Sequence, residues 1–210
     1  MHFTLMDMVT DIAQNGAESG ADLVELEIRE ISDSAGKGEF RFVVKDNGKG
    51  MSREELKRAQ DPFVTDGIKH SHRRVGLGIP FLIQTAESSG GGWNIESRKR
   101  TGPAPGGENG SKGNDGSPGT EVSAWFDLGN IDTPPVGDIP GMIRTVLLFG
   151  GPKETVVRRK RQAPGGSIEY EVRKTELVSA LGELEDIQSL VLLNRYLHSL
   201  EGDEEVKSEE

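Results

Sequence analysis

Cysteine is missing from the 210-residue chain, and histidine occurs only four times. The missing cysteine excludes disulfides, thiolate metal sites and cysteine nucleophiles, and so few histidines argue against a histidine-rich metal cage. Long apolar runs are missing too, because none reaches the roughly 18 residues needed to cross a bilayer. The first residues, Met1 to Asp7, lack the basic start and apolar stretch of a signal peptide. We therefore expect a soluble, cytoplasmic protein.

Positive charge is also in short supply, with 25 lysines and arginines against 35 aspartates and glutamates and a formal net charge of −10. This balance argues against a protein that coats nucleic acid, since neutralising phosphates requires a clustered cationic surface. Glycine and proline are plentiful at 28 and 10, while only 33% of the residues are hydrophobic. These proportions predict much loop around one core of about 150 residues.

The first predicted element is a helix over residues 4–19. Its apolar residues recur at helical spacing on one face, and Thr4 and Asp7 form a capping pair at its start. The spacing i, i+4 and i+7 places three polar side chains in one stripe on the opposite face: Asp11, Asn15 and Glu18. Taken alone, such a stripe is typical of a solvated helix face.

Two segments with alternating apolar residues, 23–31 and 39–45, predict an antiparallel hairpin. The second strand runs into Asp46-Asn47-Gly48-Lys49-Gly50-Met51, a carboxylate followed by two glycines. Glycine lets the backbone turn sharply or lie against a flat ligand, because no Cβ stands in the way. Ser52 then caps a short helix.

A polar segment, residues 60–75, leads to Gly76-Leu77-Gly78 and an apolar helix over 79–86. A glycine-rich turn that opens a helix is suited to bind an anion, because the first amide hydrogens of the helix have no partner within it. Glycine turns before helices are common, so this motif by itself is more often structural.

The chain is predicted to have one main domain over residues 1–135, with a flexible insertion at 101–118 that contains almost no apolar residues. Residues 136–201 form a small C-terminal α/β extension, and residues 202–210 form an acidic disordered tail. The elements expected around and after the insertion are strands over 93–97, 120–126, 155–161 and 167–173 and helices over 139–149, 174–181 and 186–200.

The order of these motifs resembles the ATP-binding domain of the GHKL superfamily, which includes DNA gyrase, a heat-shock chaperone, histidine kinases and mismatch-repair ATPases. The resemblance covers about residues 4 to 126. Segments similar to the superfamily's Asn box and its three Gly boxes follow in chain order: 11–21, 46–51, 74–79 and Gly119-Thr120. It implies a two-layer α+β sandwich of the Bergerat, or histidine kinase-like ATPase, type. A mixed, mostly antiparallel sheet would be covered by helices on one face, with a small C-terminal hairpin and helices added.

The resemblance also implies the ligand, ATP with Mg²⁺, and a role for each motif. Asn15 would coordinate Mg²⁺ through its amide oxygen, a hard ligand of the kind that Mg²⁺ prefers. Asp46 would accept a hydrogen bond from the adenine amino group, with Thr120 beside it. The remaining implied contacts are Gly48 and Gly50 against the base, Met51 and Phe63 as its apolar cover, Gly76, Leu77 and Gly78 at the phosphates, and Lys69, Arg73 and Arg74 as cationic partners.

Asp11 departs from the pattern of the hydrolysing branches, in which a Glu one helical turn before the Asn orients and deprotonates the attacking water. Asp has the same carboxylate with one methylene less reach, and a general base must come within hydrogen-bond distance of its proton. Asp11 is therefore the candidate catalytic residue, and we expect hydrolysis to be slow or absent. The alternative is that Asp11 only supports Mg²⁺ through water.

From the sequence, we expect this chain to lack two segments that other members of the superfamily have. A complete histidine kinase needs a phosphoacceptor helix ahead of the domain, and the roughly 70 residues after Pro135 are too few for the transducer domain of gyrase-like and mismatch-repair enzymes. The layout is similar to that of small, stand-alone bacterial ATP-binding proteins of the superfamily.

Three functions remain open for such a module. The first is an ATPase or ATP-gated switch that acts on an unidentified protein partner. The second is a serine/threonine protein kinase of the anti-sigma-factor type, in which Asp11 would activate a hydroxyl of the partner. The third is a nucleotide sensor without turnover. Nucleic acid is not expected as a partner, and a homodimer is left open.

Two basic runs, Arg98-Lys99-Arg100 and Arg158-Arg159-Lys160-Arg161, have no interleaved aromatic residues and are interpreted as solvated faces. His70 and His72 lack the further ligands that a metal pair needs, so we interpret them as surface residues.

Overall fold

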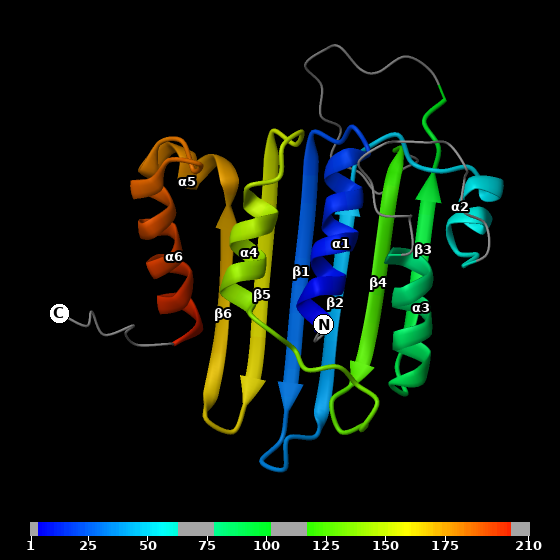
Figure 1. Ribbon diagram of the computed structural model, residues 1–210, viewed down its shortest axis with the longest axis horizontal. Helices are drawn as coiled ribbons and strands as arrows, with labels where there is room; N and C mark the ends of the chain where they lie inside the picture. The colour runs from blue at the N-terminus through cyan, green and yellow to red at the C-terminus, as the bar shows by residue number, and fades with distance from the viewer. Residues whose placement is uncertain (1–3, 63–77, 102–116, 203–210) are drawn as a thin grey trace.

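Residues 4–62, 78–101 and 117–202 are described in the computed structural model, in which one sheet carries helices on one face (Figure 1). The strands are β1 (Leu23–Ser32), β2 (Gly38–Asp46), β3 (Gly92–Arg98), β4 (Gly119–Asp127), β5 (Glu154–Ala163) and β6 (Gly166–Arg173). The helices are α1 (Leu5–Glu18), α2 (Arg53–Ala59), α3 (Gly78–Ser88), α4 (Ile139–Leu147), α5 (Lys174–Leu181) and α6 (Ile187–Glu201). Most of the predicted insertion and of the predicted acidic tail lies outside the described residues.

The six strands follow the order β3-β4-β2-β1-β5-β6. Strand β5 runs parallel to β1, and the other four neighbouring pairs are antiparallel. This order leaves β3 and β6 as the edges of the described sheet. The mixed, mostly antiparallel α+β sandwich expected from the sequence is therefore confirmed.

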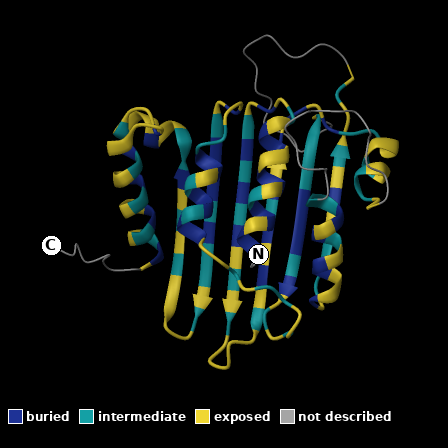
Figure 2. Cartoon of the chain, in the orientation of Figure 1, coloured by how far each residue is buried: buried dark blue, intermediate teal, exposed yellow. Residues whose placement is uncertain are grey.

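Alternation along each strand decides which face of the sheet is covered. In β2, Phe40, Phe42 and Val44 point toward the helices and are buried, while Arg41 and Lys45 lie exposed on the other face. Figure 2 shows the buried residues where α1, α3, α4 and α6 meet the sheet. Burial of these apolar faces against one another is the main stabilising contribution in a two-layer fold of this kind.

Helix α1 lies over the middle of the sheet (Figure 1). It begins at the predicted capping pair, Thr4 and Asp7. The Asp7 N–H donates to Thr4 Oγ1 at 3.2 Å, and the Thr4 N–H donates to Asp7 Oδ2 at 2.8 Å. This reciprocal box satisfies backbone donors that a helix start leaves without partners. Because the apolar face of α1 packs on the sheet, Asp11 and Asn15 are left exposed on its outer side.

Residues after 135 extend the same sheet. Strand β5 pairs with β1 from Leu23 opposite Glu154 to Ile31 opposite Gln162, and β6 returns beside β5. Helix α4, capped by Asp138, packs beside α1, and α6 packs beside α4. Among the described helices, none combines the length and the apolar character that crossing a bilayer requires.

A buried ionic cluster holds the end of α6 against β5 and β6. Arg159 is 1% exposed and pairs with Glu30 on β1 and with Glu201 at 3.3 Å. The Tyr170 hydroxyl donates to Glu201 Oε1 at 2.6 Å, and burial together with this carboxylate raises the pKa of the hydroxyl. The interpretation of residues 158–161 as one solvated face was therefore wrong, because alternation along β5 turns Arg159 toward the helices.

Glu201→Gln is expected to lower the free energy of unfolding by about 1 to 2 kcal/mol, because Gln keeps an acceptor for Tyr170 but loses the charge that pairs with Arg159. Urea unfolding followed by circular dichroism measures this. Glu169→Gln, which removes an exposed pair with Lys160, is the matched control and should change stability by less than about 0.5 kcal/mol. Equal losses in the two variants would contradict a stabilising role for the buried cluster.

Candidate functional site

Asp46 ends β2 on the side of the sheet that the helices cover. Its side chain is nearly buried, and Oδ1 accepts hydrogen bonds from the Gly48 N–H at 2.8 Å and from the Ser19 hydroxyl at 3.0 Å. Helix α1 comes close at Gly16, where an added Cβ would lie 3.5 Å from Asp46 Cβ. The last turn of α1 is therefore packed directly against the carboxylate.

Burial raises the pKa of the Asp46 carboxyl above its usual value of 3.8, and hydrogen bonds from Gly48, Ser19 and Thr120 counter this only in part. Desolvation therefore disfavours the charged form. A carboxylate offers about four acceptor positions, so one more N–H donor from a bound molecule would relieve some of this desolvation. The exocyclic amino group of adenine is such a donor.

Two glycines allow the loop after β2 to close around Asp46. A Cβ on Gly48 would lie 1.8 Å from Ser19 Oγ, and a Cβ on Gly50 would lie 1.9 Å from the Arg98 carbonyl oxygen. Gly50 also has a φ of +60°, a conformation that residues with a side chain rarely adopt. The packing of the loop itself therefore requires the glycines that the motif singled out.

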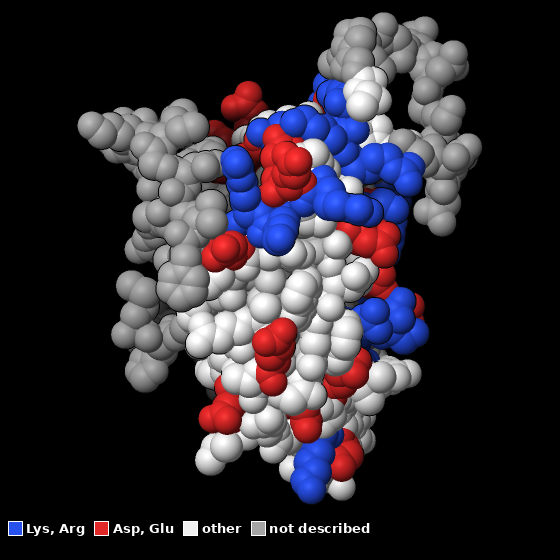
Figure 3. Space-filling view, turned by 90° about the vertical axis from the view of Figure 1, so that its right-hand side faces the viewer, with Lys and Arg blue, Asp and Glu red and all other residues white. Residues whose placement is uncertain are grey.

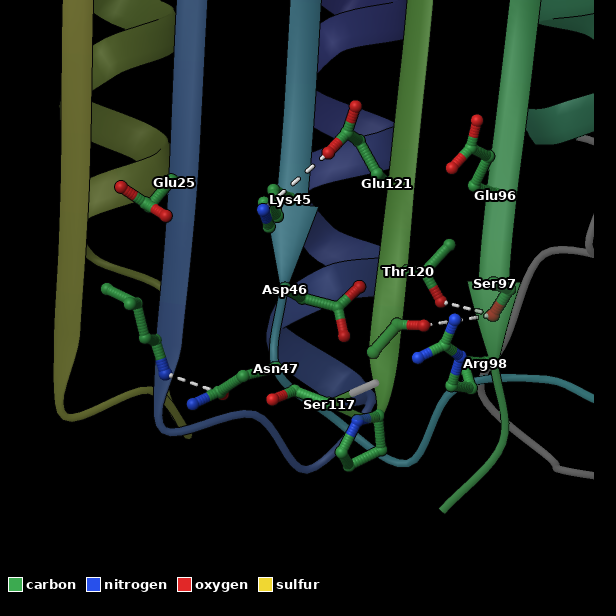
Figure 4. A pocket seen from close by; sticks show the side chains of 13 residues that line it. Glu25, Lys45, Asp46, Asn47, Glu96, Ser97, Arg98, Ser117, Thr120 and Glu121 are labelled. Carbon is green, nitrogen blue, oxygen red and sulfur yellow. Dashed lines mark hydrogen bonds and ion pairs between the residues drawn. The ribbon is translucent and has the colours of Figure 1, made fainter. Parts of the chain in front are cut away.

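Thr120 lies opposite Asp46 in the pairing of β4 with β2 and joins a short chain of hydrogen bonds (Figure 4). Its Oγ1 lies 2.8 Å from Ser97 Oγ, which also accepts from the Met51 N–H at 2.8 Å. Sequence reasoning missed Ser97 and also Ser19. The available signals were the place of Ser19 directly after the first helix and that of Ser97 in the strand that pairs with Thr120.

Asp11 and Asn15 meet the start of α3. A Cβ placed on Gly78, the first residue of α3, would lie 3.7 Å from Asn15 Nδ2 and 3.7 Å from Asp11 Cβ. The first turn of a helix has amide hydrogens without partners inside the helix and carries a positive partial charge. An amide oxygen suited to Mg²⁺, a carboxylate and a helix start suited to phosphate are thus adjacent.

The uncovered face of the sheet has a pocket of about 540 Å³ at the same end of β2 (Figure 4). Four of its lining residues are carboxylates, Glu25, Asp46, Glu96 and Glu121, against the two cations Lys45 and Arg98. A triphosphate would be repelled by this excess of negative charge. The start of α3 beside Asn15, where the first amide hydrogens lack partners within the helix, therefore suits an anionic ligand better.

The described site residues form one region between α1, the end of β2, the start of β4 and the start of α3. Their roles toward a ligand remain predictions. These residues are Asp11, Asn15, Asp46, Gly48, Gly50, Met51, Gly78 and Thr120. The other predicted site residues lie outside the described residues: Phe63, Lys69, Arg73, Arg74, Gly76 and Leu77. The same is true of His70 and His72.

Comparison with known proteins gives one family match, to the family described as histidine kinase-, DNA gyrase B-, and HSP90-like ATPase, over residues 3–130. No curated protein sequence matches. Among solved structures, the mycobacterial sensor histidine kinase MprB is similar at 19% identity over 57% of this chain and 69% of that chain, with a TM-score of 0.35. The N-terminal domain of a DNA repair protein is similar at 11% identity over 86% of this chain, with a TM-score of 0.47, and this chain covers 57% of its length.

Proposed function

The chain belongs to the family of histidine kinase-, DNA gyrase B- and HSP90-like ATPases and so carries an ATP-binding domain of the GHKL type; on this basis we propose that Asp46, Asn15 and Gly78 form its Mg·ATP site. The base would lie at the end of β2, and the phosphates at the start of α3. One observation carries the proposal: α1 joins the two ends, because Gly16 packs on Asp46 while the next residue back, Asn15, lies beside Gly78.

At the base, the Asp46 carboxylate accepts a hydrogen bond from the amino group of adenine. It thereby selects adenine over guanine, which presents a carbonyl oxygen at that position. Its own hydrogen bonds to Gly48 and Ser19 fix the direction of the carboxylate. Thr120 and Met51, tied together through Ser97, form the neighbouring wall. Because these groups are already hydrogen-bonded to one another, we expect little entropy loss from ordering them on binding.

At the phosphates, the amide oxygen of Asn15 holds Mg²⁺, and the first amides of α3 face the phosphate oxygens. The metal ion supplies neutralisation of the charge that the phosphate groups carry. Asn15 lies on a regular helix that is capped at its start and packed along its length. The fold therefore sets the backbone position of Asn15.

We assign to Asp11 the role of general base and to the whole protein that of a slow ATPase, or ATP-gated switch, acting on a protein partner. Asp11 lies one helical turn before Asn15 and beside Gly78, next to the proposed phosphate position. Its short side chain limits its reach to a water molecule. Slow turnover leaves the ATP-bound state long-lived, which suits a switch better than a motor.

The experiment is a single-turnover assay with labelled ATP and Mg²⁺. The expected result is tight binding with slow release of phosphate, which falls about tenfold in Asp11→Asn and rises about tenfold in Asp11→Glu, whose longer side chain recovers the missing reach. ATP affinity should change by less than about threefold in both variants. Glu18→Gln, two turns further along the same helix, is the control and should change neither quantity.

The outcome also separates the alternatives. Transfer of label to a serine or threonine of a partner, with none to water, would favour a protein kinase of the anti-sigma-factor type. Binding with neither hydrolysis nor transfer would favour a nucleotide sensor. Hydrolysis that is unchanged in Asp11→Asn would contradict the role of Asp11.

A further inference from the structure

Two basic segments far apart in the sequence meet on one surface that includes α2. Residues 49–58 and 98–100 contain seven cations against two carboxylates, a net charge of +5, so the other residues together carry −15. The cations are Lys49, Arg53, Lys57, Arg58, Arg98, Lys99 and Arg100, here called the α2 basic surface. All are exposed except Arg100, which is half-buried. Figure 3 shows blue side chains gathered at this end of the molecule, above a largely uncharged area.

Specific contacts hold the two segments together. Lys99 Nζ pairs with Glu55 Oε1 at 2.7 Å, and the Arg100 N–H donates to the Lys49 carbonyl oxygen at 2.8 Å. Hydrogen bonds from Lys99 and from the Ser52 cap hold the pKa of the Glu55 carboxyl at about 2. The cations are therefore arrayed on a defined surface in spite of their mutual repulsion.

We propose that the α2 basic surface is a docking site for an acidic segment of a partner protein. A cationic surface on an acidic chain attracts a partner only locally, since charges are screened beyond about 8 Å at physiological salt. An acidic protein segment fits this range, because its carboxylates pair with the cations one by one. The surrounding negative charge then repels partners that approach elsewhere.

Nucleic acid fits this surface less well for two reasons. Glu54 and Glu55 lie among the cations and would face the evenly spaced phosphates of a polynucleotide. Residues 49–58 and 98–100 contain no aromatic side chain on which a base would stack. A protein segment avoids both difficulties, because its charges need not be evenly spaced.

The docking surface is connected to the loop that surrounds Asp46. Arg100 donates from its guanidinium to the carbonyl oxygens of Asn47 at 3.1 Å and Gly48 at 3.4 Å. The Gly48 N–H in turn donates to Asp46, and the Lys49 N–H donates to the Ser19 carbonyl. A segment that engages Arg100 therefore acts on the backbone that fixes the base-binding carboxylate. This coupling rests on the proposed function, and by linkage ATP and the partner would change each other's affinity by the same factor.

The test measures binding of a fluorescein-labelled peptide of about ten glutamates by fluorescence anisotropy, with and without Mg·ATP. In Lys57→Glu/Arg58→Glu the dissociation constant for the peptide should rise by about tenfold or more. Lys37→Glu/Lys153→Glu makes the same change in net charge on exposed residues elsewhere and should raise it by less than about twofold. Saturating Mg·ATP should shift the peptide affinity of the unmodified protein by about threefold or more.

Each outcome bears on a different claim. Equal losses of peptide affinity in the two double variants would show that net charge alone causes the effect. That result would overturn the proposed docking site. Tighter binding of a single- or double-stranded oligonucleotide of about 20 nucleotides, lost in the same variant, would overturn the assignment to an acidic protein segment. Peptide binding that is lost only in Lys57→Glu/Arg58→Glu, in a protein that binds no ATP, would support the docking site and refute the proposed function.

Discussion

Asn15→Ala is expected to weaken binding of Mg·ATP by at least about 100-fold, or about 2.7 kcal/mol. The alanine removes the amide oxygen that we assign to Mg²⁺, and its methyl group offers no oxygen ligand in return. The helix itself should persist, because Asn15 is exposed and alanine favours helix. Isothermal titration calorimetry with ATP, in Mg²⁺ and in EDTA, measures the loss and its dependence on the metal.

Gln14→Ala is the matched control for this variant, since it removes an exposed amide one position earlier that contacts Glu18 instead of α3. Its ATP affinity should stay within about twofold of the unmodified protein. If Asn15→Ala bound ATP as tightly as the control in Mg²⁺, the site assignment would fail. A loss that persists in EDTA would show that Asn15 contacts the nucleotide directly.

Asp46→Asn is expected to remove the preference for ATP over GTP and to weaken ATP binding by about 100-fold. Asn keeps one oxygen, which can still accept from Gly48 and Ser19. Its amide NH₂ would then face the amino group of adenine, donor against donor, whereas the carbonyl oxygen of guanine would accept from it. Competition between labelled ATP and unlabelled GTP measures the preference.

Folding should be much less sensitive to this change than binding. Burial raises the pKa of Asp46 because the charged form is desolvated, so a neutral amide in its place should change the free energy of unfolding by no more than about 1 kcal/mol. Asp22→Asn, on an exposed carboxylate that pairs with Lys153, is the control. An undiminished preference for ATP in Asp46→Asn would rule out the assignment of Asp46 to the base.

The elements of secondary structure follow closely from the sequence. The 3.6-residue period over 4–19 and its capping pair predicted α1, and the alternation in 23–31 and 39–45 predicted the β1–β2 hairpin. These patterns are predictive because one side of each regular element is buried, and local spacing in the sequence fixes which side that is. The turn at the glycines after Asp46 could be predicted for a similar reason, since it depends on local residues alone.

The order of the strands and the contacts between distant segments could not be predicted from the sequence. No local sequence pattern predicts that β5 lies parallel beside β1, that Arg159 is buried, or that Ser97 contacts Met51. The same holds for the meeting of residues 98–100 with α2, which separate basic runs did not predict. Such contacts depend on which elements become neighbours, and no single segment encodes that.

The sequence by itself determined the kinds of element and the family of the domain, and it predicted the residues from which an ATP site would be made. Only the tertiary structure decided that α1 brings Gly16 against Asp46 and Asn15 beside Gly78, and that Arg100 connects the loop at Asp46 to the α2 basic surface. The reason is physical. Helical and strand periodicity depend on residues a few positions apart and can be recognised in the sequence. Packing, burial and charge clustering depend on segments that come together only on folding.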